Sequence, residues 1–196
     1  VYSRNLSGYI SEETETSNNH PYAETKKDAE DYVLNCNKKN MINGIVIRLS
    51  NAIGPPTDIN SNCWSLVVNN IARQLVSTNV AELNSSGEQR RDFITMTDAC
   101  RAILHLLNIE RLEHNLFNVG GEWSPKINEI IDLLKERYKL IFNIEPKIVY
   151  KNVNREKDLN LEYSIQRLKS TGFKLSNKKI VINEIDKLLY FLKERL

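Results

Sequence analysis

Glycine and cysteine are both scarce in this chain of 196 residues, which contains seven glycines and three cysteines. The cysteines, Cys36, Cys63 and Cys100, form no Cys-x-x-Cys pair, so the sequence predicts neither a disulfide framework nor a metal site. A reducing, cytoplasmic compartment is the corresponding expectation. No run of about 18 apolar residues and no signal-peptide pattern occurs, so we expect no membrane partner. A net charge of +2 without a lysine or arginine block does not indicate nucleic-acid binding.

The composition is otherwise that of an ordinary globular protein, with 41% hydrophobic and 27% charged residues. A chain of this length can bury roughly 70% of the surface that its unfolded form exposes. We therefore expect a true hydrophobic core and one or two domains.

The segment PYAETK at residues 21–26 is the most informative part of the chain. Its Tyr22 and Lys26 are four residues apart and so lie one above the other on a helix face. An ammonium group beside a phenol favours the phenolate and lowers the phenol pKa from about 10. Tyr22 could then exchange a proton with a substrate hydroxyl or carbonyl. Alternatively, the spacing arises by chance, with Tyr22 in the core and Lys26 in solvent.

Other segments accompany this one in a fixed order along the chain. They are Val1-Tyr2-Ser3, PYAETKKDAE at 21–30, RLSNAIGP at 48–55, GEQRRDFI at 87–94 followed by Thr97-Asp98, FNVGG at 117–121 and REKD at 155–158. Together they resemble the extended short-chain dehydrogenases/reductases, the NAD-dependent sugar-nucleotide epimerase/dehydratase family. The resemblance covers nearly the whole chain, but only the C-terminal half or more of such an enzyme.

The resemblance implies an α/β fold. Residues 1–60 and about 88–120 would form the later strands and helices of a doubly wound, Rossmann-like parallel sheet. Residues about 61–87 and 121–196 would form a small, interleaved substrate-binding subdomain. The glycine-rich half that binds NAD in this family would be absent.

The resemblance also assigns roles to single residues. Tyr22 would be the acid/base, and Lys26 would hold the nicotinamide ribose beside it, so both would contact the cofactor. Ser50 would pass near the nicotinamide. The nucleotide diphosphate would be held by three residues further along the chain, Asn51, Arg91 and Arg155, the arginines acting through planar forks of donors.

Each substrate-side residue also has a simpler interpretation. Asn51 could belong to an ordinary turn, and Arg91 could form a surface ion pair with Asp92 or Asp98. Arg155 is assigned with less weight than Arg91, because the spacing of its region varies among relatives.

By the same resemblance the cofactor would be NAD, with NADP possible. The substrate would be a nucleotide-diphosphate sugar, and the reaction would pass through a 4-keto intermediate. The product would serve polysaccharide or glycan biosynthesis. The enzyme would be a homodimer. Dehydratases of the family carry an Asp-Glu pair immediately before the Val-Tyr, and these positions precede Val1. Epimerase, dehydratase and reductase therefore all stay open.

A second function class follows from a missing motif. Dinucleotide binding in this fold requires a glycine-rich turn before a helix, and no Gly-x-Gly-x-x-Gly or Gly-x-x-Gly-x-x-Gly occurs. The chain alone is then inactive, and it could be a non-catalytic remnant that binds a nucleotide sugar or a partner.

Hydrophobic periodicity and turn residues predict the secondary structure. We expect helices at about 22–38, 62–77, 99–107 after a Thr97-Asp98 cap, 125–138 after a Ser124 cap, 164–171 and 181–196. Strands are expected at 44–49, 80–83, 116–120 and 146–150, and a loop at 4–20.

Overall fold

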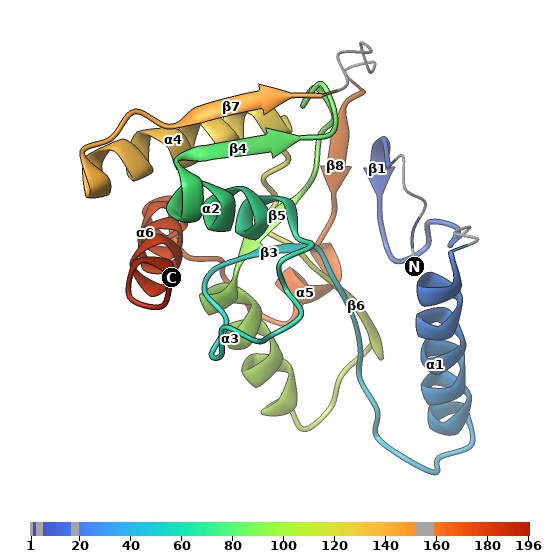
Figure 1. Ribbon diagram of the computed structural model, residues 1–196. Helices are drawn as coiled ribbons and strands as arrows, with labels where there is room; N and C mark the ends of the chain where they lie inside the picture. The colour runs from blue at the N-terminus through green and yellow to red at the C-terminus, as the bar shows by residue number, and fades with distance from the viewer. Residues whose placement is uncertain (1, 3–5, 17–19, 152–158) are drawn as a thin grey trace.

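The computed structural model describes residues 2, 6–16, 20–151 and 159–196, in which helices alternate with short strands (Figure 1). The elements in chain order are β1 (Gly8–Ile10), α1 (Pro21–Lys38), β2 (Val46–Leu49), β3 (Asn51–Ile53), α2 (Val67–Thr78), β4 (Val80–Leu83), β5 (Phe93–Thr95), α3 (Met96–Leu107), β6 (Leu116–Val119), α4 (Ile127–Phe142), β7 (Lys147–Tyr150), β8 (Leu161–Tyr163), α5 (Gln166–Ser170) and α6 (Lys179–Lys193).

Every strand pair among the described residues is parallel. The pairs are β1 with β8, β2 with β6, β3 with β5, and β4 with β7. Ser50 alone separates β2 from β3, so one extended run changes its partner from β6 to β5 at that residue. Parallel neighbours require long crossover connections, which the helices supply. The predicted α/β class with parallel strands is confirmed.

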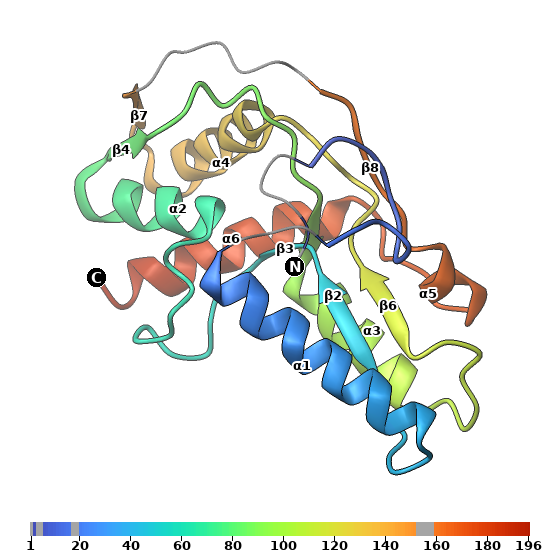
Figure 2. The same cartoon turned by 90° about the vertical axis from the view of Figure 1, so that its right-hand side faces the viewer.

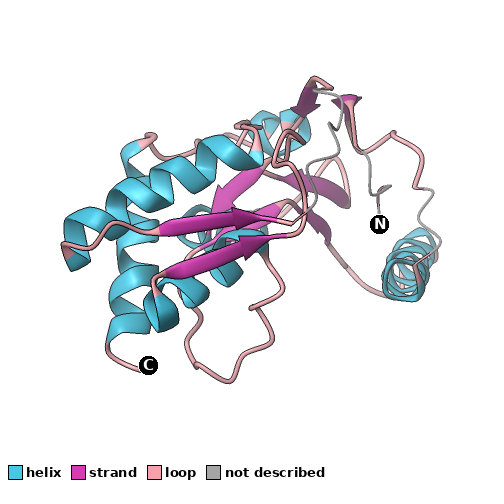
Figure 3. Ribbon diagram, turned by 45° about the horizontal axis from the view of Figure 1, so that its top comes forward, coloured by secondary structure: helices cyan, strands magenta, loops and turns pink. Residues whose placement is uncertain are grey.

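Buried apolar side chains form two clusters. One lies among α2, α4, α6 and β4, and the other among α3, β6, β8 and α5. Figure 3 shows the strands in the middle of the molecule with most helices around them, and α1 apart at the N-terminal side. No helix among the described residues combines the length and the apolar character needed to span a bilayer.

Helix α1 begins and ends close to the predicted bounds. Pro21 occupies the first turn, where a missing N–H costs nothing, and the His20 side chain at the N-cap accepts a hydrogen bond from the Tyr22 N–H at 3.3 Å. Figure 2 shows the helix running beside β2. Three of its 18 residues have buried side chains, Ala23, Glu30 and Cys36.

Five of the six predicted helix starts differ from the observed starts by two residues or more, and for α2, α3 and α4 a neighbouring contact explains the difference. Before α2, the Trp64 indole N–H donates to the Ile59 carbonyl at 2.8 Å and holds residues 59–64 in a turn. Before α3, the Thr95 hydroxyl accepts from the Asp98 N–H at 3.1 Å, so Thr95 is the cap. Before α4, residues 125 and 126 pair with the 89–91 segment, and the helix begins at Ile127.

Four strands of three residues lie where none was predicted, and two of them, β3 and β5, pair with each other. β1 falls inside the expected loop at 4–20, and β8 falls just before the predicted helix at 164–171. Each has three residues, and they pair with each other from Gly8 opposite Leu161 to Ile10 opposite Tyr163. A three-residue strand is too short to show a hydrophobic period, so only the folded chain reveals it.

Candidate active site

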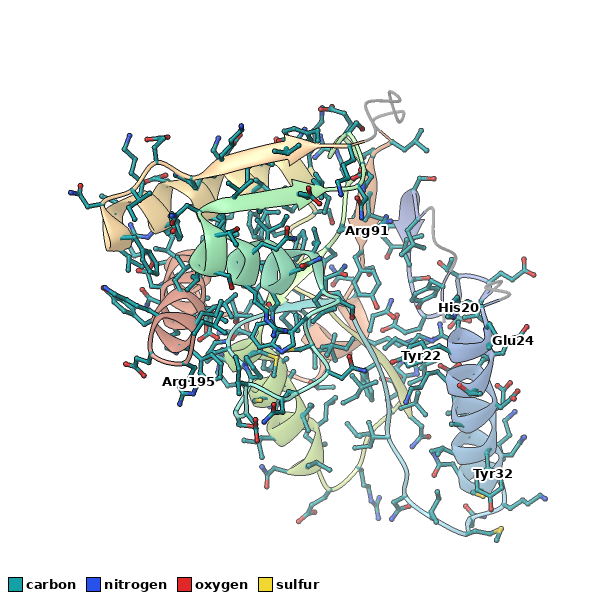
Figure 4. The ribbon with its side chains drawn as sticks, viewed as in Figure 1. His20, Tyr22, Glu24, Tyr32, Arg91 and Arg195 are labelled. Atoms are coloured by element: carbon teal, nitrogen blue, oxygen red, sulfur yellow. The ribbon has the colours of Figure 1, made fainter. Side chains whose placement is uncertain are left out.

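Tyr22 and Lys26 lie on the face of α1 that opens onto a cavity beside β2. The Lys26 ammonium nitrogen lies 5.5 Å from the centre of the Tyr22 ring, and the Tyr22 residue is 67% exposed. The cavity has a volume of about 510 Å³, and the Ile45–Leu49 segment lines its opposite side. In Figure 4, Tyr22 lies on the side of α1 facing the rest of the molecule and Glu24 on the outer side. Tyr22 is therefore not a core residue, and its hydroxyl is open to a ligand.

A buried ion pair joins the same helix face to β2. The Arg48 guanidinium donates to both carboxylate oxygens of Glu30, with Nε–Oε2 at 2.9 Å and Nη2–Oε1 at 2.6 Å. Both residues are less than one-tenth exposed. Burial acts to raise the pKa of Glu30, but the Arg48 contact outweighs it and holds that pKa below its usual value. The pair is therefore ionised at neutral pH.

Two buried phenols extend this network. Arg48 Nη1 donates to the Tyr2 hydroxyl at 2.8 Å, and that hydroxyl lies 2.7 Å from Asn118 Oδ1. The Tyr163 hydroxyl donates to the Arg48 carbonyl at 2.9 Å. Burial raises the pKa of both Tyr2 and Tyr163, so both keep their protons in neutral solution. All three phenols line the cavity, but Tyr2 and Tyr163 are buried and bonded within the protein, whereas Tyr22 is exposed.

Ser50, Asn51 and Arg91 gather around Asp92, at the start of β3 and just before β5. The Asn51 amide donates to the Asp92 carbonyl at 3.0 Å, and the Ser50 N–H donates to the Val119 carbonyl at 2.9 Å. Arg91 is half-buried, and its N–H donates to the Pro125 carbonyl at 3.2 Å. Ser50 and Asn51 are thus the first two residues after the strand that lines the cavity, and Arg91 lies on the neighbouring segment that leads into β5.

Asp92 itself is 3% exposed, and its carboxylate binds backbone N–H groups. Its carboxylate accepts from the Gly121 N–H at 2.9 Å and from the Trp123 N–H at 3.0 Å. Burial raises the pKa of Asp92 to about 6, although the nearby Ser50 hydroxyl and these two N–H groups act in the opposite direction. Asp92 thus ties the loop after β6 to the start of β5.

The two groups of predicted residues are linked through the chain itself. Tyr22 and Lys26 face β2, and the continuous run Val46–Ile53 carries Ser50 and Asn51 directly after it. Arg155 lies outside the described residues. In the ranges that the structure covers, no set of three His, Cys, Asp or Glu side chains could hold a metal ion.

The sequence contains signals for Arg48 and Glu30, to which the sequence analysis assigned no role. Arg48 interrupts an apolar strand, and a buried arginine requires an acidic or polar partner. Glu30 follows Lys26 by four residues and so shares its helix face. Their pairing could not be read from spacing, because 18 residues separate them.

Comparison with known proteins gives consistent matches. A sequence model described as the NAD dependent epimerase/dehydratase family matches residues 1–120. A search of curated proteins finds no match.

Solved structures match along nearly the whole chain. RMD from Pseudomonas aeruginosa, complexed with NADPH, is 25% identical with a TM-score of 0.78 over 100% of this chain and 66% of its own. UDP-N-acetylglucosamine 4-epimerase from Methanobrevibacter ruminantium M1, in complex with UDP-N-acetylmuramic acid, is 18% identical with a TM-score of 0.78. The match covers 95% of this chain and 58% of the epimerase. dTDP-glucose 4,6-dehydratase from Bacillus anthracis, in complex with NAD, is 20% identical with a TM-score of 0.72. The match covers 96% of this chain and 56% of the dehydratase. The chain thus spans about three-fifths of the length of these proteins, and the fold is Rossmann-like.

Proposed function

The chain belongs to the NAD dependent epimerase/dehydratase family, and on that premise we propose that it is the C-terminal portion of an enzyme that modifies a nucleotide-diphosphate sugar. The reaction would pass through a transient 4-keto sugar and serve polysaccharide or glycan biosynthesis. Support comes from the similar structures, two of which are named as a UDP-sugar epimerase and a dTDP-sugar dehydratase. Epimerase, dehydratase or reductase chemistry would be decided by residues that precede Val1.

The observation that carries this proposal is the exposed Tyr22 with Lys26 beside it at the mouth of a cavity. These two side chains fit the ribose end of NAD or NADP, because a hydroxyl and an ammonium group are both free of the core and directed to open space. The cofactor, when bound, accepts and returns a hydride. Tyr22 would move the proton of the reacting sugar hydroxyl, and Lys26 would orient the ribose and favour the phenolate.

The substrate's diphosphate would be held by Asn51 and Arg91, with Arg155 as a third contact. Asn51 and Arg91 flank the Asp92 junction, which fixes their backbones to the loop after β6. A guanidinium remains charged at any working pH and matches two phosphate oxygens at once.

The experiment that tests the proposal is Tyr22→Phe in the upstream-extended protein. Loss of the phenolic proton donor is expected to lower turnover of a nucleotide sugar by ~10²-fold or more, with binding little changed. The matched control is Tyr190→Phe, since Tyr190 is 50% exposed and lies on α6, outside the cavity lining. Turnover of Tyr22→Phe close to wild type would remove Tyr22 from the mechanism.

NADH fluorescence titration separates this proposal from a non-catalytic remnant. The 196-residue chain should bind NADH weakly or not at all under either interpretation, because it carries no glycine-rich turn. A chain extended upstream of Val1 should bind NADH only if the enzyme proposal is correct.

We also propose a cytoplasmic homodimer. Cys36, Cys63 and Cys100 are all free thiols, as in a reducing compartment. Tyr32 on α1 is 71% exposed, lies outside the cavity lining and would form part of a helix–helix interface. A monomeric mass for the complete protein in light scattering would exclude the dimer.

A further inference from the structure

Helix α1 is joined to the strand that follows it by few side-chain hydrogen bonds. Within the described residues they occur at two places. Near the C-terminal end of the helix, Asn37 exchanges two hydrogen bonds of 2.7 Å with the backbone of Gly44. Near the middle, Glu30 binds Arg48. The first contact is local in sequence, so the second is the one that relates the helix to the body of β2.

Glu30 lies on the face that carries Tyr22 and Lys26. Spacings of four and eight residues bring the three side chains into one row, with Glu30 about 12 Å along the axis from Tyr22. A bidentate guanidinium–carboxylate contact fixes both distance and orientation, whereas a single hydrogen bond leaves rotation free. A shift of the helix along its axis, or a turn about it, would break this contact.

Arg48 is itself immobilised on the other side. Its Nη1 atom donates to the Tyr2 hydroxyl at 2.8 Å and to the Glu12 carbonyl at 3.1 Å, and its guanidinium carbon lies 4.8 Å from the Tyr2 ring centre. The guanidinium is thereby held by the N-terminal segment as well as by its own strand. Glu30 meets a fixed partner, not a flexible one.

We infer that Glu30 and Arg48 are positioning residues of the proposed site: their bidentate contact sets the axial position and rotation of α1 and so aims Tyr22 and Lys26 into the cavity. The inference rests on the proposed function for the chemistry that is positioned, but not for the contact itself. A buried ion pair adds little net stability over an apolar pair of the same volume, because desolvation offsets the attraction. The pair therefore contributes mainly by fixing the position and rotation of α1.

A second bidentate pair in the same molecule provides a matched control. Arg137 on α4 donates to both oxygens of Asp186 on α6, through Nε and Nη2, at 2.8 Å each. Both helices belong to the other side of the molecule, where they pack with α2. Asp186→Asn therefore removes a contact of the same geometry without touching α1, from side chains that are 23% exposed against 7% and 4% for Arg48 and Glu30.

The first test is hydrogen exchange on the 196-residue chain and requires no cofactor. Glu30→Gln should accelerate exchange of the α1 amides on the order of tenfold while the α4 and α6 amides stay protected. Asp186→Asn should do the reverse. Arg48→Lys, which keeps the charge but loses the fork, should resemble Glu30→Gln. Unchanged exchange in α1 for both Glu30→Gln and Arg48→Lys would overturn the inference.

The second test is kinetic and uses the upstream-extended protein. Glu30→Gln should lower kcat by roughly 10- to 100-fold with KM for the nucleotide sugar little changed, because a displaced reacting group costs turnover more than binding. In a Tyr22→Phe background it should lower kcat by much less than in the wild type, since no phenol is left to position and only Lys26 is displaced. Asp186→Asn should leave kcat unchanged.

Equal losses of kcat for Glu30→Gln and Asp186→Asn, or a full additional loss in the Tyr22→Phe background, would overturn the positioning role. If the wild-type extended protein shows no turnover, the proposed function fails. The hydrogen-exchange result then still decides whether the pair fixes α1.

Discussion

Burial divides the tyrosines of this chain into those that can exchange a proton with a ligand and those that cannot. Tyr2 and Tyr163 are 8% and 5% exposed, and their hydroxyls bind groups inside the protein. Tyr22 is 67% exposed above a cavity. Sequence spacing singled out Tyr22 and Lys26, because a helix places such residues together without tertiary help. It could not pair Arg48 with Glu30, or Asn51 with the Asp92 backbone, since those contacts require the folded sheet.

Asp92 provides a test of stability against pH at this scale. Burial raises its pKa from 3.8 to about 6, so the folded state holds the proton that the unfolded chain has already released between these values. The stabilisation that comes from this protonation is therefore complete below pH 3.8 and is lost as the pH rises through 6. Its loss lowers the free energy of unfolding by on the order of 3 kcal/mol. Asp92→Asn, which cannot titrate, should show a smaller fall in unfolding free energy from pH 4 to pH 7 than wild type, measured by urea denaturation.

The matched control is Asp132→Asn, which removes a carboxylate whose side chain is 71% exposed. It should follow the wild-type pH dependence. Glu30 acts in the opposite direction, since its lowered pKa stabilises the fold above its ordinary pKa, but it is present in all three proteins and cancels. A pH dependence of Asp92→Asn that parallels wild type would show that Asp92 titrates normally in the folded state.

At the scale of single elements, the structure has a helix at each of the six places where the sequence predicts one. Contacts around each start decide the residue at which the helix begins. α1 agrees with its prediction because its start is fixed by Pro21 and His20, which adjoin it in sequence. α4 begins later than Ser124-Pro125 suggested, because that stretch pairs with the 89–91 segment. The Ser124-Pro125 start was mispredicted because a distant segment pairs with it, and the Thr97 cap because Thr97 bonds to α6 and Thr95 caps α3 instead.

The start of α3 gives a direct measurement of such a cap. Thr95 is 3% exposed, and its hydroxyl accepts the Asp98 N–H, whereas the Thr97 hydroxyl donates to Glu184 on α6 at 2.8 Å. Thr95→Val keeps the volume but removes the acceptor, and should cost about 1 kcal/mol of unfolding free energy in urea denaturation. Thr95→Ser retains a hydroxyl and should recover most of that loss. Equal losses for the two variants would mean that packing, not capping, accounts for the effect.

At the scale of the whole molecule, one edge of β2 has no partner strand in the part of the chain that the structure describes. Val46 and Ser50 donate their N–H groups to the β6 side, at 2.8 and 2.9 Å. The N–H groups of Ile47 and Leu49 point the other way along a parallel strand, toward the cavity. Among the described residues no strand pairs with that edge, and Leu49 is 46% exposed. Interior parallel strands are normally paired on both edges.

If the chain is the C-terminal portion of a longer enzyme, as proposed, an upstream strand should occupy this edge. The Ile47 and Leu49 amides should then exchange quickly in the 196-residue chain and become protected in the upstream-extended protein. The Val46 and Ser50 amides already bind β6 and serve as internal controls, protected in both. Tyr2, buried beside Arg48 at the end of the cavity, is where such a strand would lead into the chain. Rapid exchange at Ile47 and Leu49 in the extended protein would contradict the added strand.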